Sequence, residues 1–239
     1  MSPSTIMSDN ICLVNEKVLR AAANFAMTNQ KKTLAPIFII VPDRFTLQAE
    51  KILTAVAPCL LGVRVVTFSM LFNILQGFKR PSVIDKTTAV LFTWRAIQDV
   101  KTDLQYFNNS ADQYAFGEKM FNTVNQLTSC NADFATLESN AKTQTARRKM
   151  HDIAIIQKRY KELLGEQVDG SGILAWLIEN IATAQAIKDA HVYITGFEYL
   201  SVQREEVIRR IMRTARSFTA GCREGSELQR RLNEIRFAM

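Results

Sequence analysis

The stretch His191-Val-Tyr-Ile-Thr-Gly-Phe-Glu-Tyr-Leu-Ser201 decides how the rest of this chain folds. It contains a short apolar run, Val192 to Ile194, then a glycine, and apolar residues recur at helical spacing afterwards. The pattern predicts a buried strand, a sharp turn and an amphipathic helix. Nucleotide-binding α/β proteins place Mg²⁺-binding carboxylates at such a junction. This turn contains Thr195, Gly196 and Phe197. The sequence therefore has the strand, turn and helix of a phosphate-binding fold but lacks the carboxylates.

Two segments upstream repeat the strand-to-helix pattern. Ile37 to Val41 is an apolar run between two prolines, and a helix is predicted after it from Asp43, a candidate N-cap, to about Ala57. Val63 to Thr67 is a further strand that leads into another helix. Strands and helices that alternate with short loops predict a parallel sheet with helices on its faces. The fold class is therefore α/β.

The amino end is predicted to open the first such unit, with a strand at Ile11 to Val14 and a helix from Lys17 to Met27. In a P-loop protein, this junction would carry glycines whose amides wrap the phosphates, followed by Lys and Ser/Thr. Here it reads Asn15-Glu16-Lys17-Val18, and no glycine occurs before Gly62. Lys17 is therefore interpreted as a solvent-facing helix residue in preference to a phosphate ligand. We expect no ATP binding and no cofactor.

The middle of the chain changes to helical spacing throughout. This change predicts three segments: the first part of an α/β core over residues 1–83, an all-helical insertion over 84–188, and a return to the core over 189–239. The last segment is expected to hold a strand at Ser217 to Ala220 and a basic helix at Ser226 to Phe237. An α/β core would ordinarily continue further, so we expect either a small stand-alone version or a piece of a longer protein.

The composition indicates which binding partners and which cellular compartment to expect. The net charge is +7 and the pI about 9.3, which weakly favours a polyanionic partner. Charge alone favours a solvated helical face as the explanation of the arginines. No apolar run approaches the roughly 20 residues that span a bilayer, and the amino end lacks an export signal, so we expect a cytoplasmic protein with no membrane contact. The cysteines are too far apart to indicate a metal site or a disulfide framework. They are Cys12, Cys59, Cys130 and Cys222.

Four segments resemble, in order and spacing, the amino-terminal helicase-like region of AddB, also called RexB, one of the two subunits of the bacterial ATP-dependent helicase–nuclease. They are Val41 to Glu50, Val66 to Ser69, Lys149 to Ile153, and Val192 to Phe197. The resemblance implies a superfamily 1 helicase-like, P-loop NTPase-like core that no longer acts as a motor. It implies a grip on single-stranded DNA at broken ends during recombinational repair, beside an AddA/RexA-like partner. The family's nuclease domain and iron–sulfur cysteines lie further along, so neither is expected here.

The family's Chi-reading positions can be carried over residue by residue. They fall on Arg44, where glutamine is usual, and on Thr46, which matches. Phe68 also matches, whereas Met70 and Asn73 stand where arginine and tryptophan are usual. The resemblance therefore implies gripping of a strand without recognition of the usual Chi sequence.

The residues predicted to bind DNA are Arg44, Thr46, Phe68 and Ser69, at the edge of a groove across the carboxyl ends of the strands. Arg44 would contact phosphate, and Phe68 would either stack on a base or belong to the core. The leading hypothesis is a DNA-binding module without ATPase or nuclease activity. The alternative is a scaffold that docks the partner helicase–nuclease protein without binding DNA. An intact ATPase is disfavoured, because Glu198 stands two residues too late to replace the missing carboxylate.

Overall fold

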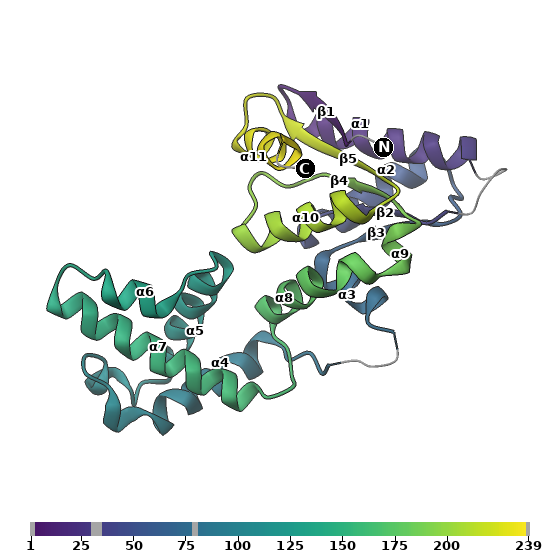
Figure 1. Cartoon of the computed structure of the whole chain (residues 1–239). Coiled ribbons are helices and arrows are strands. Elements are labelled where there is room, and N and C mark those ends of the chain that lie inside the picture. Colours follow the sequence, from purple (N-terminus) through teal and green to yellow (C-terminus); the bar gives the residue numbers. More distant parts are fainter. Residues whose placement is uncertain (1–2, 30–34, 78–80, 238–239) are drawn as a thin grey trace. The chain divides into compact units, whose positions relative to one another are not determined.

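The computed structural model describes residues 3–29, 35–77 and 81–237, and its chain divides into two compact units. The first, called here the sheet unit, comprises Met1–Phe78 and Leu174–Met239. The second, the helical unit, comprises Lys79–Ile173. In Figure 1 the sheet unit carries the purple, green and yellow parts of the chain, and the helical unit is mostly teal.

Five parallel strands form the sheet, in the order β1-β5-β4-β2-β3 (Figure 1). The strands are β1 (Ser4–Ser8), β2 (Ile37–Ile40), β3 (Val63–Val66), β4 (His191–Ile194) and β5 (Ser217–Arg223). Every residue of β2 and of β4 is buried, as expected where helices cover both faces of a parallel sheet. The α/β class and the predicted strands at β2, β3, β4 and β5 are therefore confirmed.

Helices cover both faces of this sheet (Figure 1). Helices α1 (Ile11–Asn29) and α2 (Thr46–Val56) lie on one face and contact each other. The other face carries α3 (Phe68–Leu75), α8 (Gly170–Asn180), η4 (Ile181–Thr183), α9 (Gln185–Lys188) and α10 (Val202–Thr214). Helix α11 (Glu227–Phe237) packs against β5.

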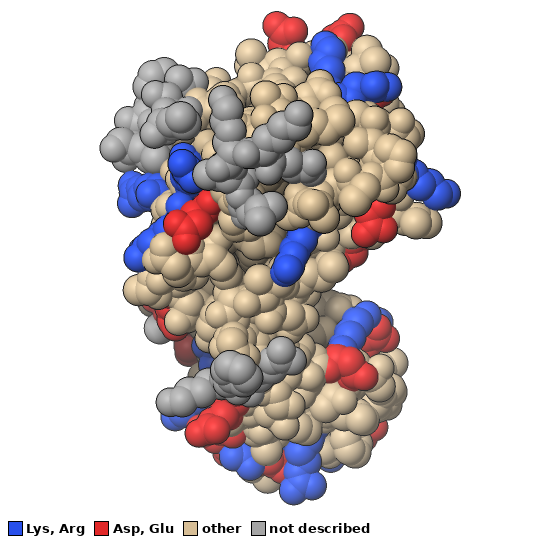
Figure 2. Space-filling view, turned by 90° about the vertical axis from the view of Figure 1, so that its right-hand side faces the viewer, with Lys and Arg blue, Asp and Glu red and all other residues tan. Residues whose placement is uncertain are grey.

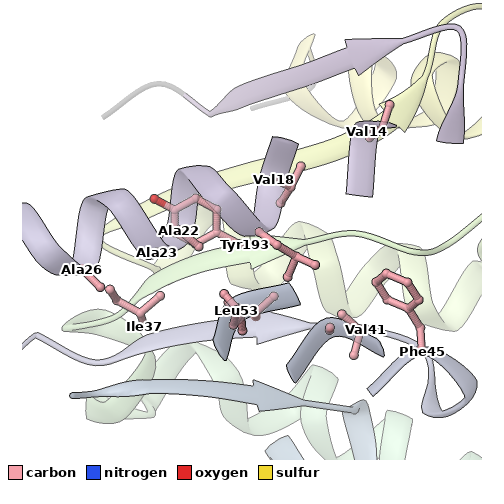
Figure 3. Close-up of a cluster of buried hydrophobic side chains, with 13 residues drawn as sticks. Val14, Val18, Ala22, Ala23, Ala26, Ile37, Val41, Phe45, Leu53 and Tyr193 are labelled. Carbon is pink, nitrogen blue, oxygen red and sulfur yellow. The ribbon is translucent and has the colours of Figure 1, made fainter. Parts of the chain in front are cut away.

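The core between α1 and the sheet is tightly packed. Figure 3 shows Val14, Val18 and Ala22 of α1 in one buried cluster with Tyr193 of β4 and Ile37 of β2. Small residues on α1 let the helix approach the sheet closely, and Gly221 of β5 extends this approach: a Cβ there would lie 2.6 Å from Cγ2 of Val18. No nucleotide-sized space separates α1 from the sheet at this point.

The strand predicted at Ile11 to Val14 is wrong, because these residues form the first turn of α1. Their apolar side chains continue the helical spacing that buries Val14 and Val18. The first strand is β1, which the sequence pattern did not reveal, since an edge strand that exposes Ser4 and Met7 has no apolar run. Lys17 is an exposed residue within α1, as its solvent-facing interpretation required.

The prediction that Asp43 caps the second helix is also wrong. Asp43–Phe45 forms a 3₁₀ turn, and α2 begins at Thr46 without a side-chain cap. Proline at position 42 fixes an extended backbone (φ −66°, ψ 151°), and the amide of Phe45 donates to its carbonyl at 2.8 Å. Burial of the Phe45 ring then holds the turn, with no need for the Asp43 side chain.

The helical unit has four main helices in its described residues: α4 (Lys86–Asp99), α5 (Tyr114–Ser129), α6 (Phe134–Ser139) and α7 (Gln144–Leu164). Short 3₁₀ turns η2 (Lys101–Asp103) and η3 (Asn108–Ser110) connect α4 to α5. A core of its own lies between α4, α5 and α7, with Ile97, Met120 and Ile156 buried. One isolated parallel bridge joins Val83 and Val168.

Candidate nucleic-acid interface

The strand order places a topological switch point between β2 and β4. From β2 the chain proceeds outward to β3, whereas from β4 it proceeds in the opposite direction to β5. In open α/β sheets the loops at the carboxyl ends of two such strands diverge and leave a ligand-binding crevice. The loops that meet here are Pro42–Phe45 and Thr195–Ser201, and the loop after β3 lies on the other side of β2. Three of the four predicted DNA-binding residues stand in or directly after these loops with exposed or partly exposed side chains.

Arg44 lies at the centre of this arrangement. Its guanidinium is 3.5 Å from a carboxylate oxygen of Glu198, so an ion pair spans the switch point. Both side chains are largely exposed, 74% for Arg44 and 69% for Glu198. Exposed pairs of this kind are weak, because water competes for both charges. Arg44 can therefore exchange its carboxylate partner for another anion at little cost.

Below the ion pair, the turn after β4 is held from the first helix. The carboxamide oxygen of Asn15 accepts hydrogen bonds from the hydroxyl of Thr195 at 2.7 Å and from the amide of Gly196 at 3.0 Å. Gly196 has a φ of +84°, and a Cβ there would lie 3.0 Å from both Phe45 and Pro42. The crevice is thus filled at its base, which leaves only its rim for a ligand.

The predicted stacking residue Phe68 lies in the core. Its side chain is 7% exposed, and its ring faces Phe197 with the centroids 5.8 Å apart. Spacing along the sequence favoured this core position, and the structure agrees with it. The preceding residue, Thr67, caps α3 by accepting a hydrogen bond from the amide of Met70 at 3.3 Å. In this conformation Phe68 supports the loop after β4 and offers no face to a base.

The remaining predicted residues are polar groups at helix starts. Thr46 begins α2, is partly exposed, and donates to the carbonyl of Asp43 at 3.0 Å. Ser69 is exposed in the first turn of α3. Amide groups at helix starts favour anions, so both hydroxyls stand where a phosphate would be tolerated. The structure brings Arg44 and Thr46 together on one loop and places Ser69 beyond the neighbouring strand.

Sequence reasoning missed two parts of this site. Asn15 was taken for a junction residue, although it is buried and holds the turn after β4. Tyr199 was passed over, and its side chain is 73% exposed. A buried polar residue on an apolar helix face was the available signal for Asn15. For Tyr199 the signal was an aromatic residue two positions before the N-cap Ser201.

The junction where a nucleotide phosphate would bind is Asp9-Asn10, between β1 and α1. The Asn10 side chain accepts the amide of Cys12 at 2.8 Å, and Asp9 adds a carboxylate that accepts from the Ser8 hydroxyl at 3.0 Å. A pocket of about 210 Å³ lies nearby. Its lining residues are Ile11, Phe197, Glu198, Arg223 and Ser226.

On the face of the molecule that Figure 2 shows, the described charged residues do not form a single patch of one sign. On the described part of the face seen in Figure 2, basic and acidic side chains are interspersed among uncharged ones. Much of the arginine excess near the carboxyl end is paired within helices, as for Arg209 and Arg210 with Glu206, and Arg231 with Glu227.

Two other classes of site are not found among the described residues. No group of three or more His, Cys, Asp or Glu side chains is arranged to hold a metal ion there. Within the same residues, none of the helices combines the length and apolar character needed to cross a bilayer.

Comparison with known proteins identifies a family whose members are similar to this chain. The family model described as "ADDB, N-terminal" matches residues 21–231. The B subunit of the ATP-dependent helicase/deoxyribonuclease of Listeria welshimeri is 27% identical over 190 residues, 76% of this chain and 16% of that protein. The proteins of the same name from Clostridioides difficile and Bacillus pumilus are each 27% identical, over 79% and 77% of this chain.

The chain spans about a sixth of the length of these relatives, which is 17% for the proteins of Clostridioides difficile and Bacillus pumilus. The match covers both units, from α1 through the helical unit to α11. All four segments that carried the resemblance lie within it. On this evidence the chain belongs to the family of AddB amino-terminal regions.

Proposed function

We propose that this chain is a non-catalytic, superfamily 1 helicase-like module that grips single-stranded DNA within a helicase–nuclease complex. The complex would act on broken DNA ends in double-strand-break repair by recombination, with an AddA/RexA-like partner. In this proposal, residues 84–188 are a helical insertion in the helicase-like core. The observation that carries the proposal is the weakly paired Arg44 at the switch point of the sheet.

The grip follows from the chemistry of the rim. A strand that crosses the carboxyl ends of β2 and β4 would bring a phosphate to Arg44, and the guanidinium would exchange Glu198 for it. The hydroxyls of Thr46 and Ser69 would contact neighbouring backbone oxygens. None of these groups reads a base edge, so binding would be indifferent to sequence.

We propose that the module is non-catalytic because of the residues at the two places where a working helicase binds ATP and its metal ion. The described residues of the first junction include no glycine, and Asn10 uses the amide that a phosphate would need. Thr195 and Gly196 stand where a motor has metal-binding carboxylates, and Asn15 takes up their hydrogen bonds. In this proposal the sheet and its helices serve only to support the loops that carry Arg44 and Glu198.

The test is a titration of a fluorescent single-stranded oligonucleotide with the full chain at several salt concentrations. We expect the logarithm of the affinity to fall linearly with the logarithm of salt, with a slope reduced by about 0.7 in Arg44→Ala. Glu198→Gln should tighten binding, because it frees Arg44 and removes a carboxylate that repels phosphate. Arg20→Ala is the matched control, since Arg20 is also an exposed arginine paired with a glutamate.

Binding that does not depend on salt, or an Arg44→Ala variant that binds like Arg20→Ala, contradicts the proposal. Oligonucleotides of different sequence should be weakened equally by Arg44→Ala, because a phosphate contact carries no sequence information.

A second candidate function is that the chain docks the partner helicase–nuclease protein and does not bind DNA. The observation in its favour is a groove of about 480 Å³ along the edge strand β3, between α2 and α3. Leu53, Val65 and Ile74 are among the residues that line it, and Met70 is exposed there. This candidate predicts that the chain binds the partner protein and no oligonucleotide at any salt concentration.

A further inference from the structure

Tyr199 has the largest exposed fraction of any large hydrophobic side chain in the part of the chain that the structure describes, at 73%. It makes no hydrogen bond, ion pair or ring contact with a described residue. Leaving most of an aromatic side chain in water gives up the free energy that its burial would supply. A ring held out in this way at a ligand-binding edge indicates a contact with something outside the chain.

The loop that carries Tyr199 is anchored on both sides. Before it, Gly196 is held by Asn15, and Phe197 packs its ring against Phe68. After it, the hydroxyl of Ser201 accepts the amide of Arg204 at 3.4 Å and begins α10. These anchors fix the backbone within two or three residues of Tyr199. The ring is therefore presented by a stiff support, which lowers the entropy lost on binding.

The position of Tyr199 is defined by its neighbour in the chain. Glu198 pairs with Arg44 across the switch point, so the loop that carries the ring lies beside the cation predicted to meet phosphate. Surfaces that bind single strands combine such a cation with an aromatic face on which a base stacks. Phe68 cannot offer this face, because its ring is buried against Phe197.

We propose that Tyr199 is a base-stacking platform of the single-strand site, and that a base stacks on its ring while Arg44 contacts the backbone. This inference rests on the proposed DNA-binding function and adds to it the residue that contacts the base. Stacking uses the face of the ring and not its hydroxyl. The contact is therefore tolerant of base identity but requires a base to be present.

The experiment combines variants of the full 239-residue chain with oligonucleotides that carry one abasic position at successive places. Tyr199→Ala should weaken binding of the intact oligonucleotide by about 5-fold or more, whereas Tyr199→Phe should stay within about 2-fold of wild type. One abasic position should weaken wild type by a similar factor and leave Tyr199→Ala unchanged. Tyr114→Ala, which removes a ring that is 53% exposed on the helical unit, is the matched control and should bind like wild type.

The outcomes separate this inference from the function beneath it. If Arg44→Ala weakens binding but Tyr199→Ala does not, the stacking role is wrong and the DNA-binding function stands. If Tyr199→Ala loses affinity and every abasic oligonucleotide still binds wild type fully, the residue acts by supporting the loop, and stacking is again excluded. If wild type shows no salt-sensitive binding, both the inference and the proposed function fail.

Discussion

The carboxylate of Asp152 is fully buried in the helical unit and accepts three backbone hydrogen bonds. The donors are the amides of Gln105, Tyr106 and Phe107, at 2.8, 2.9 and 2.9 Å. These amides follow η2, where the chain leaves one helix and has no regular partner for them. Asp152 belongs to the Lys149 to Ile153 segment of the family resemblance. This segment therefore contains a residue that holds the turn after η2 in place.

Replacing this carboxylate should be costly. Asp152→Ala removes the buried acceptor of three backbone amides, and we expect it to lower the free energy of unfolding by about 3 kcal/mol. Asp112→Ala is the matched control, because Asp112 is an exposed aspartate of the same unit whose pair with Lys101 adds little. Urea unfolding followed by circular dichroism measures both. Equal effects of the two substitutions would show that the buried hydrogen bonds are not what stabilises this turn.

The site could be located from the sequence only in part. The positions of Arg44, Thr46 and Ser69 at one edge of the sheet were predictable, because residues that follow parallel strands gather there. Exposure was predictable only in part. Spacing favoured a core position for Phe68, and its ring is covered by Phe197 from the loop after β4, far along the chain. The exposure of Tyr199 was not predicted, because it lies in a loop with no regular spacing.

At the scale of elements, the buried strands were predictable and the exposed strand was not. The strands β2 and β4 are apolar throughout because helices cover both of their faces, and this leaves a signal in the sequence. The edge strand β1 exposes part of its surface, so a helix start with apolar residues was mistaken for it. Strand order could not be predicted, because it depends on long-range pairing such as Ser4 with Thr219.

His191 links two strands of the central sheet through its side chain. Its Nδ1 lies 2.6 Å from the hydroxyl of Ser217 on β5, and its ring packs 4.4 Å from the ring of Phe25. Burial, followed by the nearby charge of Arg216, lowers the pKa of His191 below its usual 6.5. Protonation is therefore harder in the folded state than in the unfolded state.

The sign of the effect follows from this lowered pKa. The stability that neutral His191 supplies is present above pH 6.5 and is lost as the pH falls through its folded-state pKa. We expect the free energy of unfolding to fall more between pH 7.5 and 5 in the parent chain than in His191→Gln. Both proteins should carry His151→Gln, so that the two differ only in the one remaining histidine. Parallel pH profiles of the two proteins would contradict the prediction.

At the scale of the whole molecule, the order β1-β5-β4-β2-β3 brings α1 directly onto β5 and β4. The amino end of α1 is thereby placed at the carboxyl ends of the strands, which is the usual position for a bound phosphate. In this chain the position is used for packing. Gly221 admits Val14 and Val18, and Asn15 fastens the turn after β4.

Nucleotide binding should therefore be absent from the whole chain. The pocket near α1 holds about 210 Å³, below the roughly 300–1,000 Å³ of ordinary small-molecule sites. Isothermal titration with Mg²⁺–ATP should give no binding up to about 1 mM, which corresponds to less than roughly 4 kcal/mol. Glu198→Gln should not restore it, because the amides of Cys12 and Gly196 remain occupied by side chains. A micromolar dissociation constant, or an oligonucleotide affinity that changes when Mg²⁺–ATP is added, would show that the packed frame still opens for a nucleotide.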